Sequence, residues 1–306
     1  MAEPDPDTAA FLARIAGGPR LQDGTPEQAR AGHLASALAL AGPGPELASV
    51  TDEQIGGVPV RRFVPAGARG VTVYAHGGGW VVGTLDSYDT LCRILAVSSG
   101  STVLSVGYDL APEAQHPRQI GQVLAVARSA VAVGQRVALA GDSAGGYLAA
   151  VAAQRAATEG LSLVAQALVY PAVSPALDTV SAADNAEGYY LETAAMRWYW
   201  EHYLGGGAAT PLVARADLPP TLVLTAGLDP LRDEGQAYAD ALERAGVEVT
   251  RLEVEGQIHG FVRFTALLPA AQPALSDVGA FLRAHLGNSD VSSLNSAETS
   301  PSHVRN

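Results

Sequence analysis

The chain alternates between short apolar runs and longer stretches in which apolar residues recur with helical spacing. The short runs are typical of strands buried on both faces, and they lie at residues 71–75, 102–106, 136–140, 163–170, 222–226 and 247–254. The helical stretches cover residues 87–99, 120–133, 231–245 and 273–286. Strands that alternate with helices form a mostly parallel central sheet flanked by helices, so the pattern predicts an α/β fold.

Two parts of the chain break this alternation. Residues 1–48 are rich in alanine, and Thr25-Pro26-Glu27-Gln28 has the cap residue, proline and glutamine of a helix N-terminus. Between the strands, a loop at 184–191 precedes an aromatic helix at 196–204. Such an inserted helix is typical of a lid over a pocket, although its rings also suit ordinary core packing. The predicted division is N-terminal helices at 1–48, an α/β domain at 49–287 with an insertion at about 180–207, and a Ser- and Asn-rich tail at 288–306 that we expect to be disordered.

Charge and cysteine content narrow the possible partners and compartments. The net charge is -12 at pH 7, which argues against binding to nucleic acid or to an anionic membrane. No apolar run reaches membrane-spanning length, and the N-terminus lacks the basic start and apolar stretch of a signal peptide. The single cysteine, Cys92, excludes an internal disulfide and fits a reducing compartment. We therefore expect a cytoplasmic protein whose partner is a small molecule.

A serine flanked by glycines stands between a predicted strand and a predicted helix. The stretch Gly141-Asp142-Ser143-Ala144-Gly145-Gly146 follows the apolar run 136–140 and precedes a run of small residues. Gly-x-Ser-x-Gly in this setting is typical of a nucleophile elbow, a sharp turn in which larger residues at the glycine positions would clash with neighbouring backbone. By itself the spacing also fits a structural turn, and the strand–turn–helix context favours a nucleophile at Ser143.

A glycine-rich loop follows the strand at 71–75. Its sequence is His76-Gly77-Gly78-Gly79-Trp80. Consecutive glycines let the backbone approach a ligand closely and aim its N–H groups at one point. A loop of this type supplies the oxyanion hole of lipases and esterases. The alternative is a flexible turn, but the place of the loop upstream of a serine elbow favours the oxyanion hole.

Activating the serine requires a base, and His259 has the right placement. Of the seven histidines, His76 belongs to the glycine-rich loop, and His259 is the one outside that loop that lies just past the carboxyl end of a predicted strand, where open α/β sheets carry their sites. Asp229 has the same placement one strand earlier, and the order Ser143, Asp229, His259 is that of α/β-hydrolase triads. Asp233 is a rival acid one turn into the following helix. Asp142 lies beside the nucleophile, and we expect its side chain to point away from the pocket in a supporting role.

The chain resembles the hormone-sensitive-lipase-like family of α/β-hydrolases, which includes bacterial esterases with an HGGG loop. The resemblance runs from about residue 71 to 264 and rests on five motifs in order: His76-Gly77-Gly78-Gly79-Trp80, Tyr108-Asp109-Leu110-Ala111-Pro112-Glu113, Gly141-Asp142-Ser143-Ala144-Gly145-Gly146, Asp229-Pro230-Leu231-Arg232-Asp233-Glu234-Gly235 and His259-Gly260-Phe261. It implies an α/β-hydrolase fold with a helical cap made from the N-terminal helices and the insertion.

The resemblance also implies a site and an activity. The oxyanion hole would be formed by the N–H groups of Gly77, Gly78 and Ala144. The reaction would be hydrolysis of carboxylic esters with small or medium acyl groups, with no cofactor and no metal, often by a homodimer. We expect the substrate pocket to be lined by aromatic residues at Trp80, Tyr147, Tyr190, Trp198 and Trp200.

The chain departs from the family pattern in the second motif and after the elbow. Asp109 replaces the usual arginine, and Ala114-Gln115-His116-Pro117 replaces the usual His-Pro-Phe-Pro. Tyr147 stands where many members have asparagine. None of these positions belongs to the triad, so the departures concern the pocket wall and substrate preference.

Two other functions would use a related site. A lactone hydrolase, or an acyltransferase or cyclase that tailors natural products, would use the same triad and acyl-enzyme. A small-molecule receptor would keep the fold and lose the catalytic histidine, and His259 argues against that reading.

Overall fold

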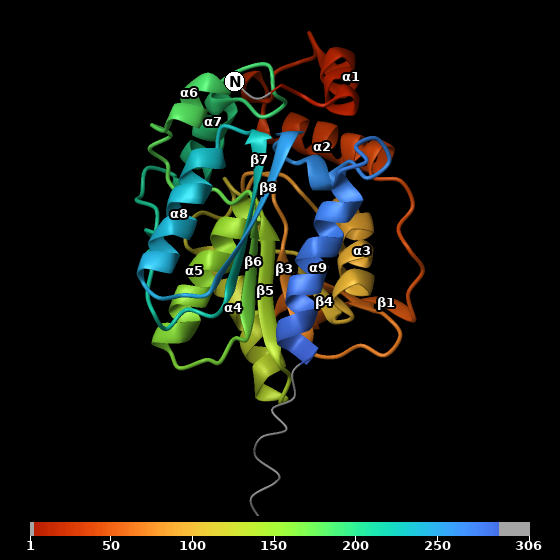
Figure 1. The fold of residues 1–306 in the computed structure, drawn as a ribbon, viewed down its shortest axis with the longest axis vertical. Helices are drawn as coiled ribbons and strands as arrows, with labels where there is room; N and C mark the ends of the chain where they lie inside the picture. Colours follow the sequence, from red (N-terminus) through yellow and green to blue (C-terminus); the bar gives the residue numbers. More distant parts are fainter. Residues whose placement is uncertain (1–2, 288–306) are drawn as a thin grey trace, which may run out of the picture.

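The computed structural model describes residues 3–287, which form one eight-stranded sheet (Figure 1). The strand order is β1-β2-β4-β3-β5-β6-β7-β8. The strands are β1 (Ser49–Ile55), β2 (Val58–Val64), β3 (Val71–Ala75), β4 (Thr102–Val106), β5 (Val137–Asp142), β6 (Ala165–Val169), β7 (Thr221–Leu228) and β8 (Val249–Ile258). The hairpin β1–β2 pairs antiparallel with β4, and all other neighbours are parallel. The predicted α/β fold with a mostly parallel sheet is confirmed.

Helices cover both faces of the sheet. They are α1 (Pro6–Ile15), α2 (Pro26–Leu40), α3 (Asp89–Ser99), α4 (Arg118–Ala132), α5 (Ala144–Thr158), α6 (Val180–Asp184), α7 (Thr193–Leu204), α8 (Arg232–Arg244) and α9 (Ala271–Gly287), with short 3-10 turns η1 (Leu21–Asp23), η2 (Asp86–Tyr88) and η3 (Phe261–Arg263). Residues of α4, α5 and α8 share one apolar core with Val73 and Leu139 of the sheet. Residues of α3 and α9 share the other with Tyr74 and Ala140. Alternate strand residues thus enter opposite cores, which explains why the central strands are apolar throughout.

The strands that carry the candidate acid and base extend further than their apolar runs. β7 continues to Leu228 and β8 to Ile258, and the two ends pair after a register shift. Polar residues are tolerated in β8 because it is an edge strand in which alternate residues, such as Arg251 and Glu253, are exposed. The parallel pairing with β7 satisfies its backbone hydrogen-bonding groups whatever the side chains are. As a result, Asp229 and His259 each directly follow a strand, at the same edge of the sheet.

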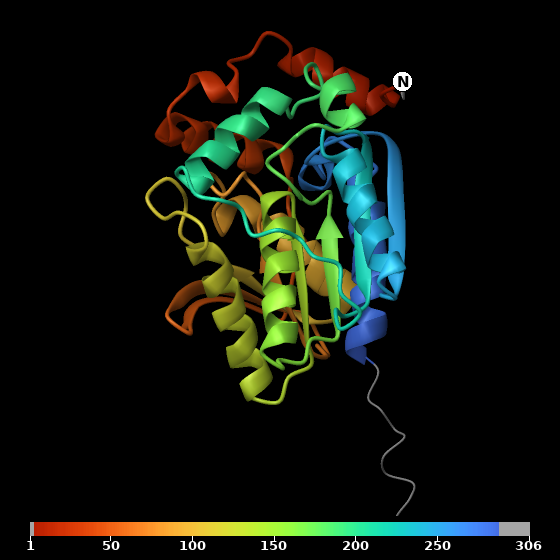
Figure 2. The ribbon, with the colours of Figure 1, turned by 90° about the vertical axis from the view of Figure 1, so that its left-hand side faces the viewer.

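Four helices lie over the carboxyl ends of the parallel strands. Figure 2 shows α1 and α2 in red and α6 and α7 in green at this end of the molecule. Arg30 of α2 ties the layer to the loops beneath: it donates hydrogen bonds to the carbonyls of Val81 and Ala111 and pairs with Glu113. The capping box at Thr25 is formed as its sequence predicts. The helix α6 was not predicted, and it is nucleated by Thr179, whose hydroxyl accepts from the N–H of Ala182.

Two further predictions concern the ends and the surroundings of the domain. The tail at 288–306, expected to be disordered, lies outside the described residues. Within residues 3–287, no helix has both the length and the apolar character needed to cross a membrane.

Candidate active site

Ser143 occupies a strained turn between β5 and α5. Its φ of 55° and ψ of -121° lie outside the regions that non-glycine residues favour. The strands on either side leave no room for larger neighbours, because a Cβ on Gly145 would lie 1.9 Å from the carbonyl oxygen of Ala75 and one on Gly141 would lie 2.3 Å from that of Gly145. A backbone strained in this way at a serine indicates a functional site rather than an ordinary turn.

The three residues predicted as a triad meet at the carboxyl edge of the sheet. His259 Nε2 lies 2.8 Å from Ser143 Oγ, and His259 Nδ1 lies 2.7 Å from Asp229 Oδ2. Asp229 Oδ1 accepts from the N–H of Leu231 at 2.8 Å, which fixes the carboxylate. With Nδ1–H donating to the carboxylate, Nε2 is left to accept the serine proton. All three residues are buried.

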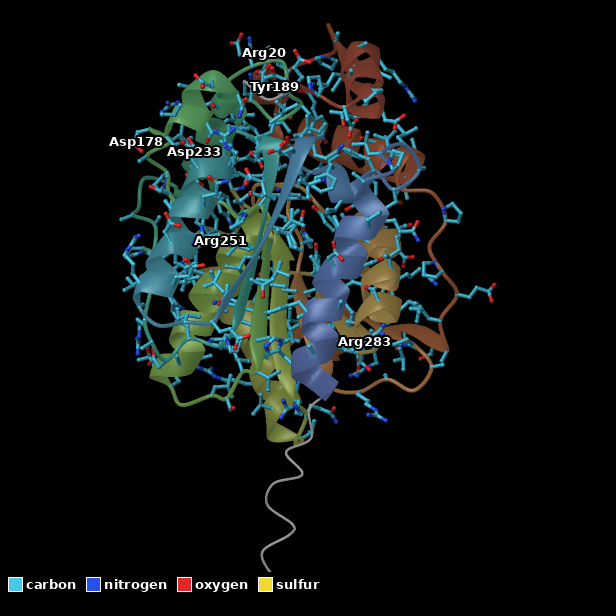
Figure 3. The ribbon with its side chains drawn as sticks, viewed as in Figure 1. Arg20, Asp178, Tyr189, Asp233, Arg251 and Arg283 are labelled. Carbon is cyan, nitrogen blue, oxygen red and sulfur yellow. The ribbon has the colours of Figure 1, made fainter. Side chains whose placement is uncertain are left out.

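The rival acid, Asp233, serves another purpose. Its Oδ2 accepts from the N–H of Ser181 at 2.7 Å, and its Oδ1 pairs with Arg232. Figure 3 shows Asp233 where α8 faces α6, at the side of the sheet. Asp233 therefore anchors α6 to α8, and Asp229 is the carboxylate that contacts His259.

Asp142 faces the glycine-rich loop. Its Oδ1 accepts from the hydroxyl of Tyr74 at 2.7 Å and from the N–H of Gly77 at 2.8 Å, and its Oδ2 accepts from Tyr88 at 3.1 Å. Burial raises the pKa of this carboxyl, while the donors around it act in the opposite direction. The supporting role expected for Asp142 is thus to hold the first peptide of the loop.

This contact corrects the predicted oxyanion hole at one position. The N–H of Gly77 already donates to Asp142, so it is not free for a substrate oxygen. Among residues 3–287, the N–H groups of Gly78, Gly79 and Ala144 have no acceptor. The HGGG motif alone does not identify which of its glycines have a free N–H group, because one of these groups is bonded by Asp142, which lies at the end of a different strand, β5. The structure thus replaces Gly77 by Gly79 in the candidate set.

The glycines at these two positions are required by the backbone. Gly78 has a φ of 103° and Gly79 a φ of 57°. A Cβ on Gly78 would lie 2.4 Å from the carbonyl oxygen of Val82, and one on Gly79 would lie 2.1 Å from the ring of Tyr199. Tyr199 of α7 therefore lies directly against the loop, a position that sequence reasoning missed because it did not resolve which face of the aromatic helix points inward.

The aromatic residues expected in the pocket take three different positions. Trp80, Tyr147 and Trp200 form a buried cluster in which the Trp80 and Trp200 rings are 4.2 Å apart, and the Tyr147 hydroxyl donates to the carbonyl of Thr210. Tyr190 instead lies beside Gly260: a Cβ added to this glycine would lie 3.5 Å from the Tyr190 ring. The structure brings Tyr190 next to the triad and places the cluster within the packing between α7 and α5.

Trp198 takes a third position on α7. Its ring packs 4.1 Å from that of His202 and 5.3 Å from that of Tyr199. The aromatic helix thus combines core packing through Trp200 with a contact on the glycine-rich loop through Tyr199, and its predicted role as a lid stays a prediction.

His76 of the glycine-rich loop is a buried histidine outside the triad. Burial lowers the pKa of His76 to about 4, so this ring is neutral at pH 7, and its Nδ1 lies 3.1 Å from the Tyr108 hydroxyl.

In the described part of the chain, no three His, Cys, Asp or Glu side chains are grouped so that they could hold a metal ion.

Comparison with known proteins agrees with this geometry. A family model described as the alpha/beta hydrolase fold matches residues 72–263. The ethyl acetate hydrolase of Pseudomonas putida is 34% identical over 92% of this chain and 99% of its own length. The carboxylesterase NlhH of Mycobacterium tuberculosis is 39% identical over 71% of this chain and 75% of its own. An ester hydrolase from the metagenome of Lake Arreo, solved with a bipyridine phosphonate derivative, has a TM-score of 0.86 at 35% identity, covering 93% of this chain and 100% of its own.

These relatives are named as hydrolases or carboxylesterases, and their matches cover 71% to 93% of this chain. The geometry of Ser143, His259 and Asp229 is that of a serine hydrolase. The chain belongs to the hormone-sensitive-lipase-like esterase family of the α/β-hydrolase fold, and it is a carboxylesterase-type enzyme that hydrolyses esters.

Proposed function

We propose that the protein hydrolyses carboxylic esters of small to medium acyl groups through an acyl-enzyme on Ser143. The observation that supports this most is the continuous hydrogen-bond chain from Ser143 Oγ through the imidazole of His259 to the carboxylate of Asp229. A serine hydroxyl becomes nucleophilic when a positioned base takes its proton, and His259 Nε2 lies at the distance this transfer needs.

The reaction follows from these contacts. Ser143 Oγ attacks the ester carbonyl while His259 Nε2 takes the hydroxyl proton, and Asp229 stabilises the imidazolium that forms. The tetrahedral intermediate collapses when His259 returns the proton to the leaving alcohol. Water then attacks the acyl-enzyme by the same proton transfers, which releases the carboxylic acid and restores Ser143.

The negative charge on the tetrahedral oxygen requires preorganised donors. We assign this role to the free N–H groups of Gly78, Gly79 and Ala144, the last of which also lies at the positive end of the α5 dipole. Each such donor contributes about 3 kcal/mol to the stabilisation of the transition state. Asp142 acts as a positioning residue, because it holds the Gly77 peptide from which the next two peptides extend.

The preference for small to medium acyl groups is supported by the closure of the site. Ser143 and His259 are only 5% and 6% exposed beneath the cap. Tyr190 and Tyr199 occupy the space beside Gly260 and Gly79. One relative is named for ethyl acetate, whose acyl group has two carbons, in keeping with a confined acyl pocket.

Water is favoured as the acyl acceptor over an alcohol. The relatives reported above are named as a hydrolase and a carboxylesterase, both of which transfer the acyl group to water. A natural-product acyltransferase or cyclase would use the same triad with another acceptor, and a lactone hydrolase would differ only in its substrate. The predicted homodimer stays a prediction, which light scattering of the purified protein tests.

The proposal is tested with p-nitrophenyl esters of increasing acyl length. We expect kcat/KM to be highest for two to six carbons, and Ser143→Ala to lower kcat by several orders of magnitude with the fold unchanged by circular dichroism. Product analysis with and without added alcohol separates hydrolysis from transfer. A protein with full activity after Ser143→Ala, or one that acts only in the presence of an alcohol, would contradict the proposal.

A further inference from the structure

An arginine is buried four residues after His259. Arg263, the last residue of η3, is 8% exposed. Within residues 3–287 no carboxylate lies within ion-pair distance of its guanidinium, and its Nε and Nη2 are inaccessible to solvent and have no hydrogen-bond acceptor. A buried charge is costly unless it is paired and its donors are satisfied. Arg263 thus lacks the partners that a purely structural buried arginine would have.

The surroundings of Arg263 stabilise its charge without satisfying its N–H groups. Its Cζ lies 5.0 Å from the centroid of the Tyr88 ring and 5.7 Å from that of Phe264. Such cation–π contacts favour the charged form. Although burial alone acts to lower the pKa of Arg263, the net shift is upward, and Tyr88 and Asp142 are among its causes. The guanidinium therefore stays charged, while its buried Nε–H and Nη2–H groups have no acceptor.

The nearby carboxylate of Asp142 does not serve as the missing acceptor. Its oxygens accept from the hydroxyls of Tyr74 and Tyr88 and from the N–H of Gly77. The contact between Tyr88 and Asp142 does, however, locate Arg263 relative to the catalytic centre. The ring that lies against Arg263 is bonded to the residue that immediately precedes Ser143.

Other contacts place Arg263 close to the triad and beneath the cap. The Phe264 ring, against which Arg263 lies, is 5.2 Å from the ring of Tyr190, which in turn lies against Gly260 beside His259. Tyr170, whose ring is 4.6 Å from that of His259, has a buried hydroxyl without a partner in the described residues. On the other side of Tyr88, the ring of His33 of α2 stacks on the Tyr88 ring at 6.2 Å, so α2 lies close to Arg263. Because Nε and Nη2 of Arg263 are inaccessible in this arrangement, a ligand can reach them only after the side chains or helices that cover them move.

We propose that Arg263 binds a carboxylate of the substrate, so that the preferred substrates are esters that also carry an ionised carboxyl group. The Nε and Nη2 edge of a guanidinium presents two parallel N–H groups, which match the two oxygens of a carboxylate. This edge is the one that lacks acceptors in Arg263. The proposal rests on the ester hydrolysis proposed above, since it adds a charged group to the same substrate.

The test compares charged esters with neutral esters of the same shape. Methyl hydrogen glutarate carries the carboxylate in its acyl part and is matched by methyl 5-oxohexanoate. Likewise, 4-acetoxybutanoate carries it in its alcohol part and is matched by 5-acetoxypentan-2-one. For at least one pair, we expect the wild-type kcat/KM to favour the charged ester at least tenfold, measured by acid release in a pH-stat. This ratio corresponds to about 1.4 kcal/mol.

Variants assign that ratio to Arg263. We expect Arg263→Met to reduce it to about one, and Arg263→Lys to retain part of it, since lysine keeps the charge without the paired donors. Arg136→Met is the matched control and should leave the ratio unchanged. It also removes one positive charge, but Arg136 lies before β5, at the opposite end of the sheet, and donates to the carbonyl of His285. If Arg263→Met does not fold, Arg263→Lys and competitive inhibition of the wild type by glutarate, with heptane-2,6-dione as the neutral control, decide the question.

Several outcomes would overturn the proposal. A wild-type ratio near one in both pairs would do so, as would a ratio that survives Arg263→Met. Equal losses on charged and neutral esters would assign Arg263 to the support of Asp142 instead. Failure of ester hydrolysis itself is separate, because the neutral esters would then also remain intact.

Discussion

Asp142→Ala tests whether the loop that carries the oxyanion donors is held from beneath. The substitution removes the acceptor of three buried donors, the hydroxyls of Tyr74 and Tyr88 and the N–H of Gly77. Leaving one buried donor unsatisfied costs about 1–3 kcal/mol, so we expect the free energy of unfolding to fall by about 3 kcal/mol or more. Because the Gly77 peptide is then released, the donors that follow it lose their alignment, and we expect kcat to fall about 100-fold, as for the loss of one oxyanion donor.

Asp142→Asn is the graded comparison. The amide oxygen can still accept from Tyr74 and Gly77, and the Tyr88 hydroxyl can turn to accept from the amide nitrogen. We therefore expect a loss of about 1–2 kcal/mol in stability, typical of the exchange of charged for neutral hydrogen bonds, and a fall in kcat of less than tenfold.

The assay combines urea unfolding with kcat on p-nitrophenyl acetate. Thr72→Val is the control for a loss of stability alone, since it removes a buried hydroxyl that lies 2.8 Å from that of Ser101, at the other end of β3. It should lower stability and leave kcat unchanged. If Asp142→Ala remains folded with kcat within threefold of the wild type, the assignment of Asp142 as the support of the loop is refuted.

Further predictions concern the acid, a buried carboxyl and the cap. Asp229→Asn should lower kcat about 10⁴-fold through loss of the correct imidazole tautomer, whereas Asp233→Asn should act mainly on thermal stability; equal kinetic losses would contradict the assignment. Burial raises the pKa of Glu234 to about 8 from an ordinary 4.5, so between these values the folded state holds a proton that the unfolded state has lost. The free energy of unfolding should therefore fall as the pH rises from about 4.5 to 8, and Glu234→Gln should remove this fall in urea unfolding at a series of pH values. Trp200→Ala should cost about 3–5 kcal/mol of unfolding free energy, a value below 1 kcal/mol arguing against the packing role. Tyr190→Ala should change the ratio of kcat/KM between short and long acyl esters about tenfold, and an unchanged ratio would remove Tyr190 from the pocket.

The sheet and the triad could be predicted from sequence because both depend on local pattern. Fully apolar runs identify strands buried on both faces, and parallel strands bring their carboxyl ends to one edge. A residue that directly follows such a strand, as Asp229 and His259 do, is therefore placed by topology alone. Sequence position also favours Asp229 over Asp233 as the catalytic acid, since Asp229 directly follows β7 and Asp233 lies within α8.

The oxyanion donors and Arg263 could not be predicted in the same way. Which glycine of the loop keeps a free N–H depends on Asp142, a residue 65 positions away whose side-chain direction is set by tertiary packing. Arg263 appears in sequence as an ordinary polar residue after the catalytic histidine, and its burial becomes evident only when Tyr88 and Phe264 are seen around it. The inward face of α7 was equally hidden, because aromatic residues occupy several of its sides.

The central claim is that Ser143 carries the acyl group. Its most direct test is mass spectrometry of the protein after brief reaction with p-nitrophenyl acetate and acid quench, in the wild type and in Ser143→Ala. We predict an added acetyl group on the peptide that contains Ser143 in the wild type, and its absence after Ser143→Ala. An acetyl group on another residue whose formation and loss keep pace with turnover would contradict the account.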